Sequence, residues 1–382
     1  MQRYLQVASF IAALGISIAH AETVKIGLLG GQTGGLASLD QPLLHGAELA
    51  VEEINATGGV DGKQLELIAR DTRSDTGETA VMANEMVGLQ VNFLVTPCDA
   101  DTTIAAGQAG QAAGIVTISG CASPPILPGN VGDYLFLNAT PDNIQGTALA
   151  EYAEKQGYKT ALTLVSPDSP YTEKLPQYFA SVFRKDGGNV LPTVSYKMGQ
   201  QDFSVEVSKI RDISPKPDVI VTSAFEPDFP AFIKQLRAAG VDIPVLSADA
   251  IDTATTFALG GAAEGVVFST HGFPEAGNRL SQFNKRYQAK FGSAPESIFA
   301  ALGYDLIEVI AATVKGAGGH LDGGALLASL NNIENLKITT GSITYKGMNR
   351  VPNRQVALVR VVDGKPQHVE DIIPDASKIP AP

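Results

Sequence analysis

Short β-type segments alternate with longer helical segments along most of this 382-residue chain, and this alternation constrains the fold more than any other feature. The segment VKIGLL at residues 24–29 precedes an amphipathic pattern at residues 42–56, and LELIA at residues 65–69 precedes another at residues 80–89. Such alternation is typical of βαβ units and parallel sheets. The sequence therefore predicts an α/β fold with doubly wound, parallel central sheets.

The alternation stops once and then resumes, which indicates more than one sheet. Prolines and glycines between residues 124 and 141 are too frequent for a helix. Helical and β-type segments alternate again over residues 143–246, followed by helical patterns at residues 278–291 and 298–315. A late β-type run at residues 355–362 fits a strand that returns to an earlier sheet. Two sheets of similar make-up are the simplest interpretation.

The first 21 residues have the pattern of a secretory signal peptide. Arg3 supplies the positive charge, and residues 7–19 form a mostly apolar run that is too short for the ~20 residues of a spanning helix. Ala19-His20-Ala21 is a small-x-small site, which predicts cleavage after Ala21. The alternatives are an uncleaved anchor or a buried N-terminal helix. We expect a protein that is exported and diffuses freely outside the cytoplasm.

Charge and motifs exclude several classes of function. Asp plus Glu number 40 against 28 Lys plus Arg, a net charge of −12 that leaves no basic footprint for a nucleic acid. The chain has no P-loop, no HExxH and no GxSxG. Histidines 45, 271, 320 and 368 are too scattered to suggest a metal cluster. We expect a binding protein that is not an enzyme and has no cofactor and no metal.

The two cysteines, Cys98 and Cys121, each follow a short apolar segment that we interpret as a strand. If these strands are parallel neighbours, both thiols lie at the same edge of one sheet. Disulfides form and persist in oxidising compartments. A Cys98–Cys121 disulfide is therefore favoured, and two free thiols are the alternative.

Several segments together resemble one known family. The strand KIGLLG, the loop GQTGGLASLD and the helix HGAELAVEEINATGGVDGKQLELIARDTRSD look like the N-terminal signature of the leucine/isoleucine/valine-binding family. TPCDADTT, TISGCASPP, SPDSPYTEKL, SAFEPDFPAFIKQLRAAG and LSADAID match in the same order. Members of this family are periplasmic solute-binding proteins of ATP-driven amino-acid importers. The resemblance spans most of the chain after residue 21.

The resemblance implies two lobes joined by three hinge crossings, with a small solute trapped between the lobes as they close. It places lobe 1 at residues 22–140 and 271–345, and lobe 2 at residues 141–270 and 346–382. The implied protein is a periplasmic monomer that delivers an amino acid or analogue to a membrane permease. A sensor with the same fold and a signalling partner is the alternative, and a secreted enzyme is disfavoured because no catalytic grouping is visible.

The resemblance also implies the ligand-contacting residues. In lobe 2, Asp249 falls where the family places an acidic partner for a ligand ammonium group, although Asp is also a preferred N-cap and could cap the helix that follows. Phe225 would form a pocket wall or would be an ordinary core aromatic. The full implied set is Leu39, Asp99, Cys121, Ala122 and Ser123 from lobe 1, and Tyr171, Phe225 and Asp249 from lobe 2.

Asp99 departs from the pattern of the family. Amino-acid binders of this family usually present a Ser at this position to the ligand carboxylate, which an Asp would repel. Asp99 could instead cap the next helix on the backbone N–H of Thr102. Alternatively, Asp99 and Asp249 together form an acidic pocket for a cationic ligand. An aromatic acid, an amide or another small amine therefore stands beside the aliphatic amino acid as a possible ligand.

Overall fold

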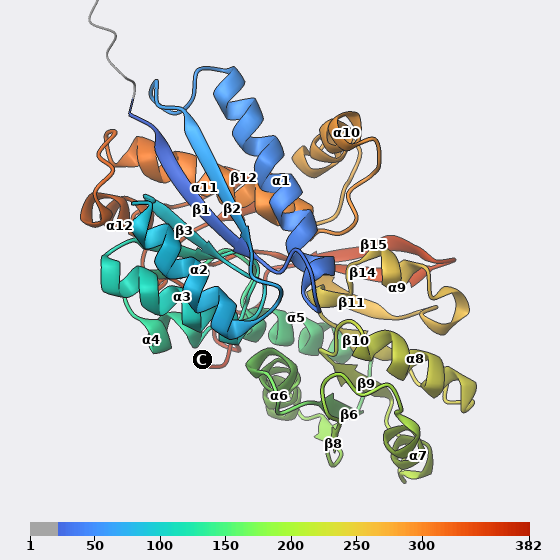
Figure 1. The fold of residues 1–382 in the computed structure, drawn as a ribbon. Coiled ribbons are helices and arrows are strands. Elements are labelled where there is room, and N and C mark those ends of the chain that lie inside the picture. The colour runs from blue at the N-terminus through green and yellow to red at the C-terminus, as the bar shows by residue number, and fades with distance from the viewer. Residues whose placement is uncertain (1–21) are drawn as a thin grey trace, which may run out of the picture.

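The computed structural model describes residues 22–382, so the predicted signal peptide at residues 1–21 lies outside the described residues. Two α/β lobes occupy the upper and lower halves of the view in Figure 1. Each lobe has its own central sheet and its own hydrophobic core. Within residues 22–382, no helix has the length and apolar character needed to cross a membrane.

The first lobe is built around a five-stranded parallel sheet in the order β2-β1-β3-β4-β5. Its strands are β1 (Val24–Gly30), β2 (Leu65–Asp71), β3 (Phe93–Thr96), β4 (Val116–Ser119) and β5 (Leu135–Leu137). The helices between them are α1 (Ala37–Ala56), α2 (Thr76–Gly88), α3 (Ala100–Ala113) and α4 (Leu127–Val131).

The second lobe is built around a larger sheet in the order β15-β14-β11-β10-β9-β6-β7, with β8 also paired to β6. Strands β6 to β11 pair in parallel, whereas β14 runs antiparallel to β11 and β15 antiparallel to β14. The strands are β6 (Thr160–Val165), β7 (Asn189–Val190), β8 (Val194–Ser195), β9 (Val219–Thr222), β10 (Val245–Ser247), β11 (Val267–Thr270), β14 (Val356–Val362) and β15 (Lys365–Ile372). The helices are α5 (Asp142–Lys155), α6 (Pro170–Lys185), α7 (Ser204–Asp212), α8 (Asp228–Ala238), the 3-10 helix η1 (Asp249–Ile251), α9 (Ala254–Phe257) and the 3-10 helix η2 (Gly260–Ala262).

The chain passes between the lobes three times. It leaves the first sheet after β5, and it returns to the first lobe after β11. There α10, α11, α12 and the β12–β13 hairpin contribute to the first core, before β14 rejoins the second sheet. The helices are α10 (Arg279–Phe291), α11 (Phe299–Gly316) and α12 (Gly323–Asn331), and the hairpin strands are β12 (Leu336–Ile338) and β13 (Gly341–Ile343). Doubly wound lobes joined by three crossings are the architecture that the sequence predicts.

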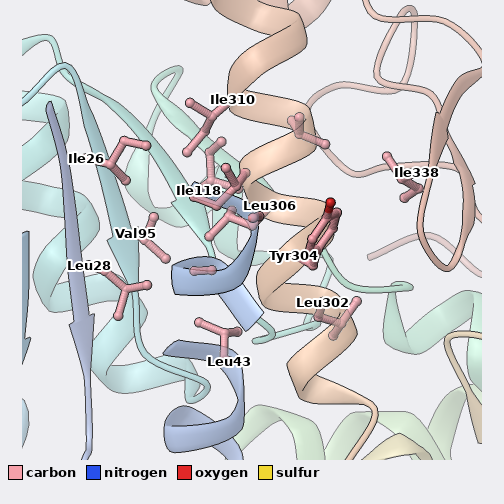
Figure 2. Close-up of a cluster of buried hydrophobic side chains, with 14 of the residues drawn as sticks. Ile26, Leu28, Leu43, Val95, Ile118, Leu302, Tyr304, Leu306, Ile310 and Ile338 are labelled. Atoms are coloured by element: carbon pink, nitrogen blue, oxygen red, sulfur yellow. The ribbon is translucent and has the colours of Figure 1, made fainter. Parts of the chain in front are cut away.

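Helices α1 and α11 pack against each other on one face of the first sheet, and Figure 2 shows side chains of both helices meeting those of the strands. A Cβ atom on Gly46 of α1 would lie 1.7 Å from the Ala300 carbonyl oxygen, and one on Gly303 of α11 would lie 1.9 Å from that of Leu43. The two backbones therefore approach through glycines. This contact fixes the first turn of both helices at the edge of the first lobe that faces the second.

Some predicted boundaries are wrong. Helix α1 begins at Ala37 rather than Pro42, and Pro42 lies inside the helix, where it cannot donate the usual backbone hydrogen bond. A one-turn helix, α4, forms in the segment that we expected to be non-helical, with Pro128 in its first turn, where a proline N–H is not needed. Helix α12 and strand β15 were not predicted; β15 has mostly exposed side chains and no clear apolar alternation.

Candidate ligand-binding site between the lobes

A cavity lies between the two lobes, with about 410 Å³ of empty space when the solvent at its open side is included. Its lining includes every residue that the sequence resemblance proposes as a ligand contact. The lining residues are Leu39, Cys98, Asp99, Ala100, Cys121, Ala122, Ser123, Pro124 and Phe299 from the first lobe, and Ser169, Tyr171, Phe225, Asp249 and Ala250 from the second.

The first-lobe wall follows the carboxyl ends of two neighbouring strands. Cys98 comes after β3 and Cys121 after β4, and the two are joined by a disulfide, as the sequence predicts. The buried carboxylate of Asp40, on α1, accepts hydrogen bonds from the backbone N–H groups of Gly31 (2.6 Å) and Cys98 (2.9 Å). The loops of this wall are therefore held by a covalent bond and by backbone hydrogen bonds.

Asp99 is the N-cap of α3. Its Oδ2 atom accepts from the backbone N–H groups of Asp101 (3.0 Å) and Thr102 (3.2 Å). This is the hydrogen bonding that the capping interpretation expects. Asp99 still lines the cavity, so its negative charge is close to any ligand that enters.

The second-lobe wall is also built at the carboxyl ends of neighbouring strands. Tyr171 lies beyond β6, Phe225 beyond β9 and Asp249 beyond β10. Open α/β sheets bind ligands at this end of their strands. Phe225 is only half-buried and meets the Tyr171 ring edge-on at a centroid distance of 6.2 Å, so it forms a pocket wall and is not a core residue.

Asp249 has no capping role. The cap of α9 is Thr253, whose side chain accepts from the Thr256 N–H. The Asp249 carboxylate instead accepts a hydrogen bond from the Tyr171 hydroxyl, with 2.9 Å between Oη and Oδ1. Its side chain is 3% exposed. The alternative interpretation of Asp249 as an N-cap is therefore wrong.

His271 does not line the cavity but contacts Asp249, and the sequence did not point to it. It follows β11, and its Nε2 atom lies 2.9 Å from Asp249 Oδ2. Tyr171, Phe225 and Asp249 follow the carboxyl ends of strands, and His271 also follows the carboxyl end of a β-type run. This position is the signal in the sequence that could have identified it. We had considered the histidines only as metal ligands, for which their sequence spacing is unsuitable.

A second buried carboxyl group, Asp142, lies near Asp249 at the start of α5. Neither of its oxygen atoms has a hydrogen-bond partner among the described residues. Burial raises the pKa of Asp142 well above the usual carboxyl range, the nearby Ser123 hydroxyl opposes this shift, and the charge of Asp249 adds to it. Burial therefore favours the neutral form of Asp142.

Apolar side chains form the rest of the cavity. Leu39 comes from the first turn of α1 and Phe299 from the first turn of α11, which the close packing of these helices brings to the same wall. Phe299 lies at least 175 residues beyond the other first-lobe residues of the site. No local motif marked it, and only the packing of α11 on the first lobe brings it there.

The cavity offers backbone donors but no basic side chain. The N–H groups of Ala100, Ala122 and Ser123, all in cavity-lining residues, have no acceptor within residues 22–382. Such donors near a helix N-terminus suit an anion such as a carboxylate. Among residues 22–382, no Lys, Arg or His side chain lines the cavity. The described part of the chain contains no group of three or more His, Cys, Asp or Glu residues that could hold a metal ion.

Comparisons with known proteins agree with this geometry. A family model described as periplasmic binding protein matches residues 23–366. A Leu/Ile/Val-binding protein homologue of Brucella melitensis is 23% identical over 364 residues, which cover 95% of this chain and 98% of that protein.

Two solved structures share the fold along nearly their whole length. The leucine-binding protein LivK of Thermotoga maritima matches with a TM-score of 0.84 and 25% identity, over 92% of this chain and 99% of that one. LivJ, the substrate-binding protein of a branched-chain amino acid transporter of Streptococcus pneumoniae, in complex with isoleucine, matches with a TM-score of 0.82 and 26% identity, over 92% and 100% of the two chains. These matches confirm the predicted two-lobed architecture.

Proposed function

This chain belongs to the periplasmic binding protein family, and we propose that it is the solute receptor of an ABC importer, one that captures an amino acid or a related small amine between its lobes. The choice of an amine rests on the environment of Asp249. This residue is a buried carboxylate at the cavity, and no Lys or Arg within residues 22–382 forms an ion pair with it. A buried charge is costly unless it is paired, and a ligand ammonium group would supply the pair.

The opposite wall suits a carboxylate. The free N–H groups of Ala100, Ala122 and Ser123 can donate to it, and the Ser123 hydroxyl adds a fourth donor. Phe225, Phe299 and Leu39 would enclose an apolar side chain. The ligand-contacting set that we propose is therefore the eight residues named from the sequence, extended by Ala100 and Phe299.

Capture follows from lobe closure. We place the lobe boundaries at residues 140/141, 270/271 and 345/346, so that the proposed contacts divide between two rigid bodies. A ligand that touches both bodies stabilises the closed form by its differential affinity, and a shift from 1:99 to 99:1 takes about 5.5 kcal/mol. Small-angle scattering would show a smaller radius of gyration with saturating ligand, and an unchanged radius would contradict the closure.

The location of the protein follows from its family, which acts in the periplasm. The proposed route is export directed by residues 1–21, with cleavage after Ala21. The closed complex would act as a monomer that docks on the membrane permease. Mass measurement of the mature protein from a periplasmic extract would test the cleavage site.

The decisive experiment identifies the solute. The protein is purified without added ligand and denatured, and the released small molecules are identified by mass spectrometry. Calorimetric titration then compares the twenty amino acids with small amines, amides and benzoates. Binding of an amine-bearing solute supports the proposal. Binding of benzoates alone, which have no ammonium group, would contradict it.

A further inference from the structure

The histidine behind the cavity connects the site to the hinge. His271 is fully buried and stands at the second crossing between the lobes. Its Nε2 atom lies 2.9 Å from Asp249 Oδ2. Its Nδ1 atom lies 3.3 Å from the backbone nitrogen and 3.1 Å from Oγ1 of Thr140, which stands at the first crossing.

The Thr140 contact determines where the imidazole proton is. A backbone N–H can only donate, so Nδ1 of His271 must accept from the Thr140 N–H. A hydrogen on Nδ1 would leave the Thr140 N–H without this acceptor. The proton of the ring is therefore on Nε2, where it is donated to the carboxylate of Asp249. The ring is a neutral imidazole in this arrangement, not an imidazolium.

Two neutral donors thus hold the Asp249 carboxylate. The Tyr171 hydroxyl donates to Oδ1 and itself accepts from the Ala250 N–H at 3.2 Å, while His271 donates to Oδ2. Both donors orient the carboxylate without cancelling its charge. An imidazolium in the same place would form an internal ion pair with Asp249 and would compete with a ligand ammonium group.

Acidic groups near His271 affect the protonation of its ring, and the Thr140 contact must be considered together with them. Asp142 and Asp252 are further acidic groups near Asp249, and negative charge there would favour a protonated histidine. Burial opposes this effect, since it raises the pKa of Asp142 well above its usual range and that of Asp252 to about 7. The Thr140 N–H also favours the neutral ring, because its hydrogen bond to Nδ1 is lost when Nδ1 is protonated.

We propose that His271 is a positioning residue for the ligand ammonium group: its neutral Nε2–H orients the Asp249 carboxylate and leaves it charged, and the backbone of Thr140 selects that tautomer. The proposal rests on the amine-binding function argued above. Thr140 and His271 stand at two of the three crossings. Hydrogen bonds therefore connect Asp249, the proposed partner of the ammonium group, to two hinge segments.

The tautomer can be tested without any ligand. The imidazole nitrogen shifts of ¹⁵N-histidine-labelled protein are recorded at neutral pH, and His271→Gln assigns the signal of residue 271. We expect the neutral Nε2–H form. Thr140→Ala is the matched control: it removes Oγ1 and keeps the N–H, so the tautomer should not change. An imidazolium or an Nδ1–H form in the parent protein would overturn the proposal.

A second experiment measures binding by calorimetry, with L-leucine and its deaminated counterpart 4-methylpentanoate as probes. His271→Leu removes a donor to a charged group, which corresponds to a roughly ten- to hundredfold loss of L-leucine affinity, with little change for 4-methylpentanoate. His271→Gln can donate an amide N–H to Asp249 and should recover most of the loss. His320→Leu, at an exposed position, controls for the loss of a histidine. Thermal unfolding checks that each variant is folded.

The outcomes separate this proposal from the function on which it rests. If the parent protein has the neutral Nε2–H tautomer but binds none of the amines, the function is wrong and the tautomer assignment stands. If the parent protein binds L-leucine and His271→Leu binds it equally well, the function stands and the positioning role of His271 is wrong. Equal losses for both probes would also overturn it, because they would indicate a general structural role.

Discussion

The two walls of the cavity hold their ligand groups by different means. The first-lobe wall consists of loops fixed by the Cys98–Cys121 disulfide and by the Asp40 carboxylate, and it offers mainly backbone N–H groups. The second-lobe wall offers side chains, and a hydrogen-bond network through Tyr171 and His271 orients its one charged group. Changes in the first wall should therefore affect stability most, and changes in the second should affect which ligand charge is accepted.

The largest expected effect tests the covalent part of the first wall. Replacing both Cys98 and Cys121 by Ser should lower the free energy of unfolding by about 3 kcal/mol, because the disulfide closes a loop with a sequence separation of 23 residues. Denaturant titration at neutral pH measures this. Ligand affinity should change much less than stability.

The parent protein treated with a thiol reductant should match this double variant, and the reductant should not change the variant itself. Thiol labelling of the untreated parent protein should find no reactive cysteine. Two reactive thiols would contradict the difference drawn between the walls.

The next effect tests the charge of the second wall. Asp249→Asn keeps the size of the side chain and removes a charge-assisted hydrogen bond to the ligand ammonium group, worth about 1.5 to 3 kcal/mol. The affinity for the amine ligand should fall roughly ten- to a hundredfold in calorimetric titration.

Asp252→Asn is the matched control for this variant. Asp252 lies three residues further on and accepts from the Thr270 hydroxyl at 2.6 Å, but it does not line the cavity. Its replacement should leave the ligand affinity unchanged. An Asp249→Asn protein that binds the amine as tightly as the parent would remove the ammonium assignment.

A smaller effect concerns the pH dependence of the first wall. Burial raises the pKa of Asp40 to about 7, well above its value of about 3.8 in the unfolded chain. A raised pKa in the folded state means that the folded protein binds more protons between these values. The stability contribution of Asp40 is therefore fully present below about pH 4 and is lost as the pH rises through about 7.

Asp40→Asn isolates this contribution. Between pH 5 and pH 8, the free energy of unfolding of the parent should fall by about 2 kcal/mol more than that of Asp40→Asn. Denaturant titrations at both pH values measure the difference. The variant should be less stable at pH 5, because an amide oxygen and an amide NH₂ cannot accept from both Gly31 and Cys98. Parallel pH profiles for the two proteins would contradict a titrating Asp40.

The features that the sequence predicts are those that depend on local order along the chain. Cys98 and Cys121 each follow a strand, so the rule for parallel neighbours and the oxidising compartment implied by the signal peptide together predicted their disulfide. The predicted start of α1 is wrong because a proline is usual in the first turn of a helix, whereas here the turn before Pro42 is already helical.

The features that the sequence does not predict depend on contacts between distant segments. His271 bonds to Thr140, 131 residues earlier, and Phe299 reaches the cavity only because α11 packs on α1 through Gly46 and Gly303. Hydrophobic periodicity reports which face of a helix is buried, but it does not report against which helix. The eight residues taken from the family resemblance carry such long-range information, because the family pattern already reflects the folded arrangement.

The smallest expected effect concerns Asp99, the acidic side chain with which the first-lobe wall lines the cavity. Asp99→Ser removes a negative charge from the cavity and keeps an N-cap, because Ser caps a helix about as well as Asp. Thermal stability should therefore change by less than about 0.5 kcal/mol. The affinity for a ligand that carries a carboxylate should improve by roughly two- to fivefold, the size of one weakened, partly screened charge repulsion. Calorimetry with the native solute measures the change. A loss of affinity similar to that of Asp249→Asn would show instead that both walls use carboxylates to bind a cation, and the contrast between a backbone wall and a charged wall would then be wrong.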